Sequence, residues 1–186
     1  MIFSSLEFLC VFLPVVFALY CVIPSLKVKN ALLIVASLFF YAYGEPVYVL
    51  LMIFSAIVNY AMARLIDRGQ CAKKVFLVID IVLNLGMLAV FKYADFAVDT
   101  VNRLLSVRIP QPGITLPIGI SFFTFQALSY VIDVYWERVE AQKSFWNILL
   151  YISFFPQLIA GPIVKYRDIN EAITNRSMDA DEIARG

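Results

Sequence analysis

The sequence predicts an all-α protein, a polytopic transmembrane helical bundle of about five to six hydrophobic segments with additional interfacial helices. Composition is the first observation: 62% of the 186 residues are hydrophobic and only 16% are charged, whereas charged residues make up about a quarter of an ordinary soluble domain. The second observation is that the apolar residues form long runs separated by short polar breaks. A helix needs about 20 such residues to cross the hydrocarbon core of a bilayer.

Three apolar segments are predicted in the first half of the chain: residues 6–23, 31–43 and 47–66. The second of these has 13 residues, which is short for an independent crossing. A polar break with Lys27 and Lys29 precedes it, and Gly44, Glu45 and Pro46 predict a tight turn after it. The third segment is long enough to cross the membrane without help from its neighbours.

A fourth apolar segment, residues 75–91, contains Asp80 and Asn84. Residues 92–107 interleave apolar and charged side chains, so we expect an amphipathic or weakly apolar helix, for which the membrane interface is one location. Residues 108–117 contain three prolines and a glycine, and are predicted to form a loop.

Residues 116–136 form the most informative segment, because this apolar run contains two polar groups. It opens with Pro117 and Gly119, carries Gln126 near its middle, and carries Asp133 near its far end. A buried amide without a partner costs on the order of 1–3 kcal/mol, and a charge costs more. We therefore expect this segment to face other protein or a polar cavity rather than lipid.

Three stretches complete the chain: a polar connection at 137–144, an apolar stretch at 145–164, and a polar interfacial segment at 165–186. Pro156, Gly161 and Pro162 interrupt the apolar stretch. Such interruptions at membrane depth are typical of bent or re-entrant backbone that is buried in protein.

The distribution of lysine and arginine predicts the orientation. The breaks at 27–29 and 64–74 are basic and the break at 44–46 is not, which places the two basic breaks in the cytoplasm and the amino terminus outside. A simple count of crossings then places residues 165–185, with four basic residues, outside the cytoplasm and against the rule. One resolution is that residues 145–164 dip into the membrane and return.

Polar residues within the segments allow two interpretations. Asp80 and Asn84 are four residues apart and share one helix face, and Gly119, Gln126 and Asp133 are spaced by seven, which also places them on one face. These faces either border a substrate path or active cavity, or make interhelical hydrogen bonds that fix the bundle. Among these residues, Asp80 costs the most free energy inside a membrane, so we expect its carboxyl group to have an interaction partner. Asp133 lies nearest a membrane boundary, where water could solvate it.

Aromatic residues at the ends of segments are interpreted as anchors at the membrane interface; they are Tyr41, Tyr43, Tyr135, Trp136 and Trp146. Cys10, Cys21 and Cys71 have neither paired nor metal-ligand spacing, and we interpret the first two as small buried side chains. No metal site is predicted.

Two whole-chain counts exclude classes of function. There is no histidine, which excludes histidine acid–base chemistry and histidine metal ligation within this chain. The net charge of +1 gives no bulk attraction to nucleic acid.

Four segments in this order resemble the membrane-bound O-acyltransferase family, specifically its bacterial alginate O-acetylation branch. They are MIFSS with FLP at 12–14, NALLIVASLFFYAY at 30–43, FKYADFAVD at 91–99, and the pair LPIGISFFTFQALSYVIDVY at 116–135 and FFPQLIAGPIVKYRD at 154–168. Together they cover most of the chain.

The resemblance implies a multi-pass O-acyltransferase of the bacterial inner membrane, with helices around a funnel. It implies acetyl transfer to an exported polysaccharide such as alginate, with acetyl-CoA or a derived acyl carrier as donor and a periplasmic acetyltransferase as partner. No cofactor is expected to be bound. Asp80, Asn84, Gln126, Asp133 and Gln157 are given scaffold or funnel roles.

The catalytic histidine of the family lies on a later helix, and members are considerably longer than this sequence. We therefore expect residues 1–186 to form a single amino-terminal part of a larger membrane-embedded acyltransferase domain. No catalytic residue is assigned, and the chain alone is predicted to be inactive. The alternative is a non-catalytic membrane transport or scaffold subunit.

Overall fold

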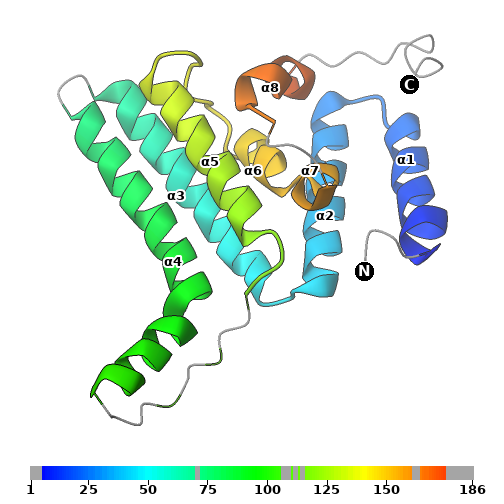
Figure 1. Cartoon of the computed structure of the whole chain (residues 1–186). Coiled ribbons are helices and arrows are strands. Elements are labelled where there is room, and N and C mark those ends of the chain that lie inside the picture. Colours follow the sequence, from blue (N-terminus) through cyan, green and yellow to red (C-terminus); the bar gives the residue numbers. More distant parts are fainter. Residues whose placement is uncertain are drawn as a thin grey trace.

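The computed structural model describes residues 6–69, 72–105, 110, 113, 116–160 and 164–174. These residues form helices and contain no β-strand, which confirms the all-α class. The elements, in chain order (Figure 1), are η1 (Phe8–Phe12, a π-helix), α1 (Leu13–Val22), α2 (Leu26–Gly44), α3 (Tyr48–Arg68), α4 (Lys73–Leu105), α5 (Ile120–Tyr135), α6 (Phe145–Ser153), α7 (Phe155–Ala160) and α8 (Tyr166–Thr174).

Within the described part of the chain, three helices are long and apolar enough to cross a membrane: α2, α3 and α4. Two shorter apolar helical segments, Phe8–Val22 and α5, accompany them. At 1.5 Å per residue, the 19 and 21 residues of α2 and α3 extend about 30 Å, the thickness of the hydrocarbon core. The protein is therefore a multi-pass membrane helical bundle, as its composition predicts.

The expected polar break before the second segment is wrong, because Lys27 and Lys29 belong to the first turns of α2. Pro24 lies just outside this helix, whose first residue is Leu26. The aliphatic stems of lysines let a helix begin inside the apolar layer while the ammonium groups reach water. The segment predicted as 31–43 is thereby extended to a full crossing length.

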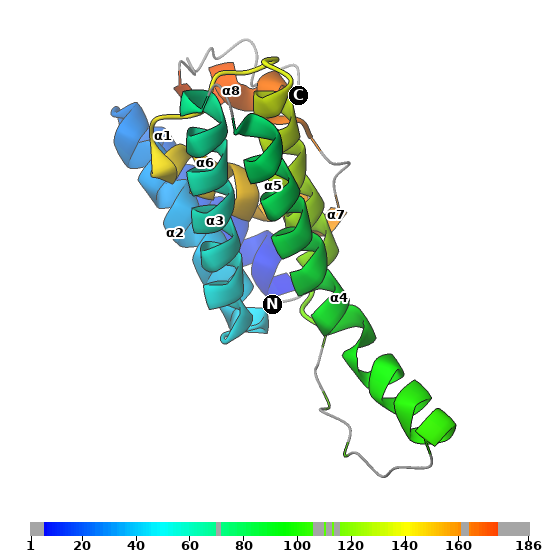
Figure 2. The same ribbon diagram turned by 90° about the vertical axis from the view of Figure 1, so that its left-hand side faces the viewer.

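The separate interfacial helix predicted at 92–107 is also wrong, because residues 73–105 form one helix of 33 residues, α4. Nothing between Met87 and Leu105 ends a helix, since glycine and proline are absent from that stretch. The helix is about 50 Å long, longer than a bilayer core requires. Its last turns extend beyond the other helices (Figure 2).

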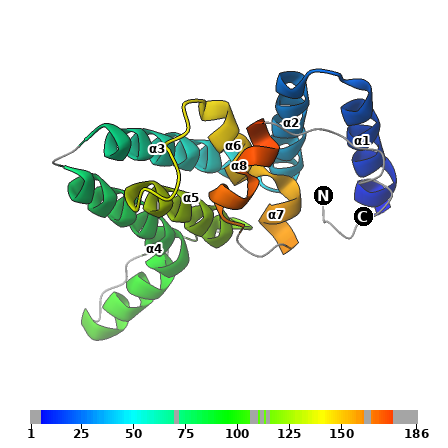
Figure 3. The same ribbon diagram turned by 90° about the horizontal axis from the view of Figure 1, so that it is seen from above.

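Helix α5 occupies the centre of the bundle and packs against α3, α4 and α6 (Figures 1 and 3). Ten of its 16 residues are buried. Gly119 precedes the helix with φ 78°, a left-handed conformation that favours glycine. The predicted start at 116 was therefore too early, and Gly119 does not share the helix face of Gln126 and Asp133.

The stretch after α5 enters the bundle and returns. Helix α6 ends at Ser153 and α7 begins at Phe155, so the interruption falls at Phe154, with Pro156 already inside α7. The side-chain amide of Gln142, before α6, donates a 2.7 Å hydrogen bond to the hydroxyl of Tyr166, the first residue of α8. Both ends of the stretch thus lie at the same end of the bundle, which resolves the conflict in the crossing count. Residues 161–163 and 175–186, with the predicted break at 161–162, lie outside the described residues.

Candidate functional site in the polar interior

Polar side chains in the bundle interior form two groups. The first joins α3 to α4, where Asn59 and Asn84 exchange amide hydrogen bonds of 3.1 and 3.2 Å. Asn59 also donates to the carbonyl of Ser55 at 2.8 Å, and Asn84 donates to the carbonyl of Asp80 at 2.9 Å. Asn84 therefore makes an interhelical contact. Sequence reasoning missed Asn59, although a lone amide in an apolar segment was the signal used for Asn84.

Asp80 is fully buried, one turn before Asn84 on α4. No hydrogen bond reaches either of its carboxylate oxygens from the residues that the structure describes. The expected partner is therefore absent from this part of the chain. A buried carboxyl group without a hydrogen bond costs free energy, so we expect Asp80 to lower the stability of the bundle.

The second group joins α5 to the re-entrant helices α6 and α7. The side-chain amide of Gln126 donates to the carbonyl of Tyr151 at 2.7 Å and to Oε1 of Gln157 at 3.1 Å. One residue of α5 thus holds both short helices, on each side of the interruption at Phe154. Leaving these acceptors unpaired in a buried site would cost free energy, so Gln126 fixes the position of the re-entrant segment.

Three buried tyrosines extend this second group towards α8. The ring of Tyr166 lies 4.9 Å from that of Tyr130 and 5.2 Å from that of Tyr151, both in edge-to-face geometry. The hydroxyl of Tyr151 donates to the carbonyl of Val164 at 2.9 Å, and the backbone amide of Gln142 donates to the hydroxyl of Tyr130 at 2.9 Å. Burial raises the pKa of Tyr166, and its hydroxyl donates a 2.8 Å hydrogen bond to Oδ1 of Asn170.

This tyrosine cluster was not predicted, because tyrosine was considered only as an interface anchor. The available signal was spacing: Tyr130 is four residues after Gln126 and three before Asp133, which places all three on one face of α5. The interpretation as an interface anchor is also wrong for Tyr41. It is buried, and its hydroxyl donates to the carbonyl of Ile118 at 2.9 Å. The exposed Tyr43, in contrast, has the exposure expected of an anchor.

Asp133 is buried at the end of α5, and water does not solvate it as one alternative proposed. One carboxylate oxygen forms an ion pair of 3.4 Å with Arg138. The guanidinium group of Arg138 also lies 4.3 Å from the ring centre of Trp136. The turn after α5 therefore folds back to bring a cation to a carboxylate that the membrane would otherwise penalise.

Cys10 and Cys21 are exposed, which contradicts their interpretation as buried side chains. The reason is that η1 and α1 contact the rest of the bundle along one edge, through rings of Phe8 and Phe12 against Phe40. The remaining surface of this segment faces outward. Cys71 lies outside the described residues.

Amides and hydroxyls make most of the hydrogen bonds in the polar interior, which also contains the buried carboxyl groups of Asp80 and Asp133. Among the described residues there is no group of three or more metal-ligating side chains. Amides and protonated tyrosines orient backbone and ligands through hydrogen bonds, and they are poor general bases at neutral pH. Fold and site together define a membrane-embedded helical bundle whose polar interior positions a re-entrant segment.

Comparison with known proteins gives a more specific class. The chain is 36% identical over 194 residues to a probable alginate O-acetylase of Pseudomonas aeruginosa, covering 100% of the chain and 37% of that protein. It is equally similar to a probable alginate O-acetylase of Azotobacter vinelandii, of which it covers 38%. It is 32% identical to a peptidoglycan O-acetyltransferase of Helicobacter pylori, over 91% of the chain and 38% of that protein.

These matches confirm the resemblance to the bacterial alginate O-acetylation branch of the membrane-bound O-acyltransferases. The chain spans about 37% of the length of the first of these curated relatives. No family model matches it, and no solved structure matches it.

Proposed function

We propose that this chain forms part of a membrane O-acetyltransferase that transfers acetyl groups to an exported polysaccharide such as alginate. The observation that carries the proposal is similarity along the whole chain to proteins named as alginate O-acetylases, and along most of it to one named as a peptidoglycan O-acetyltransferase. The acceptors in those names differ, but each contains glycan hydroxyl groups. The class of reaction is therefore better supported than the identity of the polysaccharide.

The described helices would supply the scaffold of this enzyme. Helix α5 and the re-entrant helices α6 and α7 would form one wall of a funnel, with Gln126 and Gln157 holding the wall together across 3.1 Å. Neighbouring parts of the funnel would be lined or held in place by Asp80, Asn84 and Asp133. A funnel within the membrane would keep water away from an activated acetyl group and limit its hydrolysis.

The donor would be acetyl-CoA or a derived acyl carrier, and a periplasmic acetyltransferase would be the partner that completes transfer. The basic ends of α2 and α4 would then face the cytoplasm of a bacterial inner membrane. No residue of the 186 is a histidine, so we assign positioning roles to this chain and no acid–base step.

Genetic complementation tests the proposal. The complete gene that contains these codons is deleted in its own bacterium and returned on a plasmid, and base-released acetate is measured per unit of exported polysaccharide. We expect the wild-type gene to restore acetylation, Gln126→Leu to lower it at least threefold, and Phe125→Leu, at an exposed position of the same helix, to leave it unchanged.

Two outcomes would overturn the proposal. Acetate per sugar could stay the same after deletion, which would exclude a role in acetylation. Alternatively, deletion could lower the amount of exported polysaccharide without changing its acetylation, which would favour the transport or scaffold subunit.

A further inference from the structure

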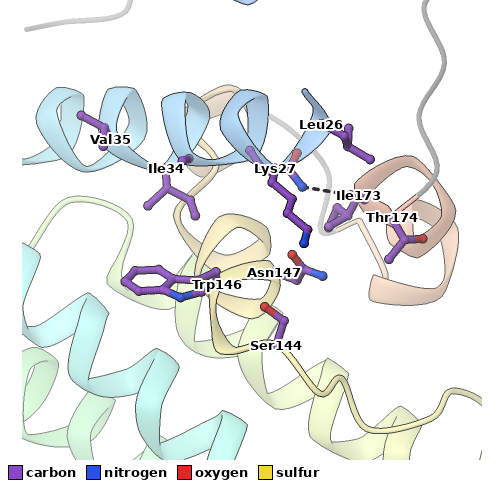
Figure 4. Close-up of a pocket in the computed structure, with 11 residues that line it drawn as sticks. Leu26, Lys27, Ile34, Val35, Ser144, Trp146, Asn147, Ile173 and Thr174 are labelled. Carbon is purple, nitrogen blue, oxygen red and sulfur yellow. Dashed lines mark hydrogen bonds between the residues drawn. The ribbon is translucent and has the colours of Figure 1, made fainter. Parts of the chain in front are cut away.

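A groove lies between the first half of α2, the start of α6 and the end of α8 (Figure 4). Its volume is about 530 Å³, within the range of about 300–1,000 Å³ that is usual for small-molecule sites. The groove is separate from the polar interior, because the residues that surround Gln126 do not line it. Its lining residues are Leu26, Lys27, Asn30, Ala31, Ile34, Val35, Ser144, Trp146, Asn147, Ile173 and Thr174.

The groove is amphipathic along its length. In Figure 4 the side chain of Lys27 extends from α2 towards Asn147 and Ser144, while Val35 and Trp146 lie further along the helix. Lys27 and Val35 are eight residues apart, which is about 12 Å along α2. The polar end therefore lies at the end of the membrane span, and the apolar end lies deeper in the hydrocarbon layer.

Helix α8 closes one side of the groove. The side-chain amide of Asn30 donates a 3.0 Å hydrogen bond to the carbonyl of Ile173, shown as a dashed line in Figure 4. This contact joins α2 to α8 across 143 positions of the sequence, so the groove is a product of tertiary structure. Asn30 thus holds the wall that faces Lys27.

The polar end of the groove is positively charged. Lys27 forms none of the ion pairs found among the described residues. The ends of α3 and α4 that lie at the same end of the bundle (Figure 1) carry further basic residues: Arg64, Arg68, Lys73 and Lys74. Two of them are paired, Arg64 with Asp67 and Lys73 with Glu137. A basic membrane end attracts anionic lipid, by about 1 kcal/mol per cation near the surface.

The apolar end is open to the surroundings. Val35 is 65% exposed and Trp146 is 63% exposed, although both belong to a bundle that lies in a membrane. Acyl chains are the apolar material that surrounds such side chains in a membrane.

We propose that this groove binds an anionic phospholipid, with its phosphate at Lys27, Ser144 and Asn147 and the upper part of one acyl chain along Val35 and Trp146. The charge of Lys27 selects an anionic head group, and the apolar wall selects a molecule with a hydrocarbon tail. The site stands independently of the acetyl-transfer proposal, since it needs only the membrane and the geometry of the groove.

Fluorescence quenching tests the site in the complete protein that contains residues 1–186. Every tryptophan except Trp146, Trp136 among them, is replaced by phenylalanine, so that Trp146 is the single fluorophore. The protein is reconstituted in phosphatidylcholine nanodiscs, and a small fraction of dibrominated phosphatidylglycerol or dibrominated phosphatidylcholine is titrated in. Bromine quenches tryptophan only at contact range. We expect phosphatidylglycerol to reach half-maximal quenching at a mole fraction at least threefold lower than phosphatidylcholine does.

Matched variants separate the groove from general surface charge. Lys27→Gln should abolish the preference for phosphatidylglycerol, and Lys27→Arg should keep it. Lys143→Gln removes an exposed lysine near the start of α6 that does not line the groove, and it should leave the preference unchanged. Thermal unfolding of each variant shows whether the bundle is intact.

Equal quenching by the two lipids in the parent protein would overturn the proposal and show only ordinary contact with acyl chains. A loss of preference in Lys143→Gln as large as that in Lys27→Gln would also overturn it. If Lys27→Gln fails to fold, Lys27→Arg and Lys143→Gln still decide, because the proposal requires both to keep the preference.

Discussion

The segment Phe8–Val22 and helix α5 are both apolar and nearly equal in length, yet they occupy opposite environments. In the first, only Phe8 and Val16 are buried, whereas ten of the 16 residues of α5 are buried. Figure 3 shows α1 at the outer edge of the bundle and α5 inside it. The difference lies in a few polar side chains: α5 carries an amide and a carboxylate at Gln126 and Asp133, and Phe8–Val22 carries neither.

Membrane solvation explains this difference. Lipid tails are as apolar as leucine, so an apolar helix gains little by exchanging lipid for protein. An amide or carboxyl group in lipid lacks hydrogen-bond partners, so a helix that carries one is stabilised by other helices. In these two segments, burial therefore follows the polar side chains and not the hydrophobicity.

The largest expected effect comes from placing a carboxylate on the exposed face of α1. Val15 is half exposed near the middle of Phe8–Val22. Val15→Asp should raise the free energy of membrane insertion by about 2.5–3.5 kcal/mol, because no helix among the described residues covers that face to supply a partner. The inserted fraction of newly made chains measures it. Val15→Leu serves as the control and should insert normally; normal insertion of the aspartate variant would show that protein or water covers this face.

Two buried carboxyl groups should respond with opposite signs to the same substitution. Asp80→Asn should raise the free energy of unfolding by about 1–3 kcal/mol, because no described residue bonds its carboxylate. Asp133→Asn should lower it by about 1 kcal/mol, because it removes the ion pair with Arg138. Unfolding in detergent measures both. A loss of stability in Asp80→Asn would mean that Asp80 has a partner beyond the described residues.

Without the side-chain amide of Gln126, α5 should, like α1, be held less firmly by the rest of the bundle. Gln126→Leu should lower the free energy of unfolding by about 1–2 kcal/mol, because two acceptors on α6 and α7 lose their donor. Limited proteolysis around Phe154 should accelerate, since the re-entrant helices lose their tie to α5. Phe125→Leu, on the exposed face of the same helix, should change neither quantity; equal effects from both variants would refute a specific role for the amide.

The cost of polar groups in lipid also explains which parts of the fold could be predicted from the sequence. Composition and run length predicted the membrane helices, and the polar residues of 116–136 predicted that this segment faces protein. The continuity of α4 and the burial of Tyr41 were not predictable by the same reasoning. A change from apolar to amphipathic pattern does not by itself end a helix, and tyrosine suits both a membrane interface and a buried hydrogen bond. Asp80 was predicted to be buried with a partner, and only the burial is observed.

The smallest expected effect is at the surface, where polarity no longer decides burial. Lys73, at the start of α4, donates a 2.6 Å hydrogen bond to Glu137, in the turn after α5. That contact and the charge of Lys73 lower the pKa of Glu137 below its ordinary value of 4.5. The folded state therefore binds the proton more weakly than the unfolded chain. The stabilisation is present above pH 4.5 and is lost as the pH falls through the lowered pKa.

Glu137→Gln should accordingly lower the melting temperature slightly at pH 7 and leave it unchanged in strong acid. Because the carboxylate is exposed, salt should reduce the difference at pH 7 as well. Melting curves of the parent and variant at several pH values and salt concentrations test both statements. A difference in melting temperature that persisted in acid or at high salt would show that Glu137 stabilises its turn through packing. The pair of Lys73 and Glu137 would then not be an ordinary surface ion pair that salt screens.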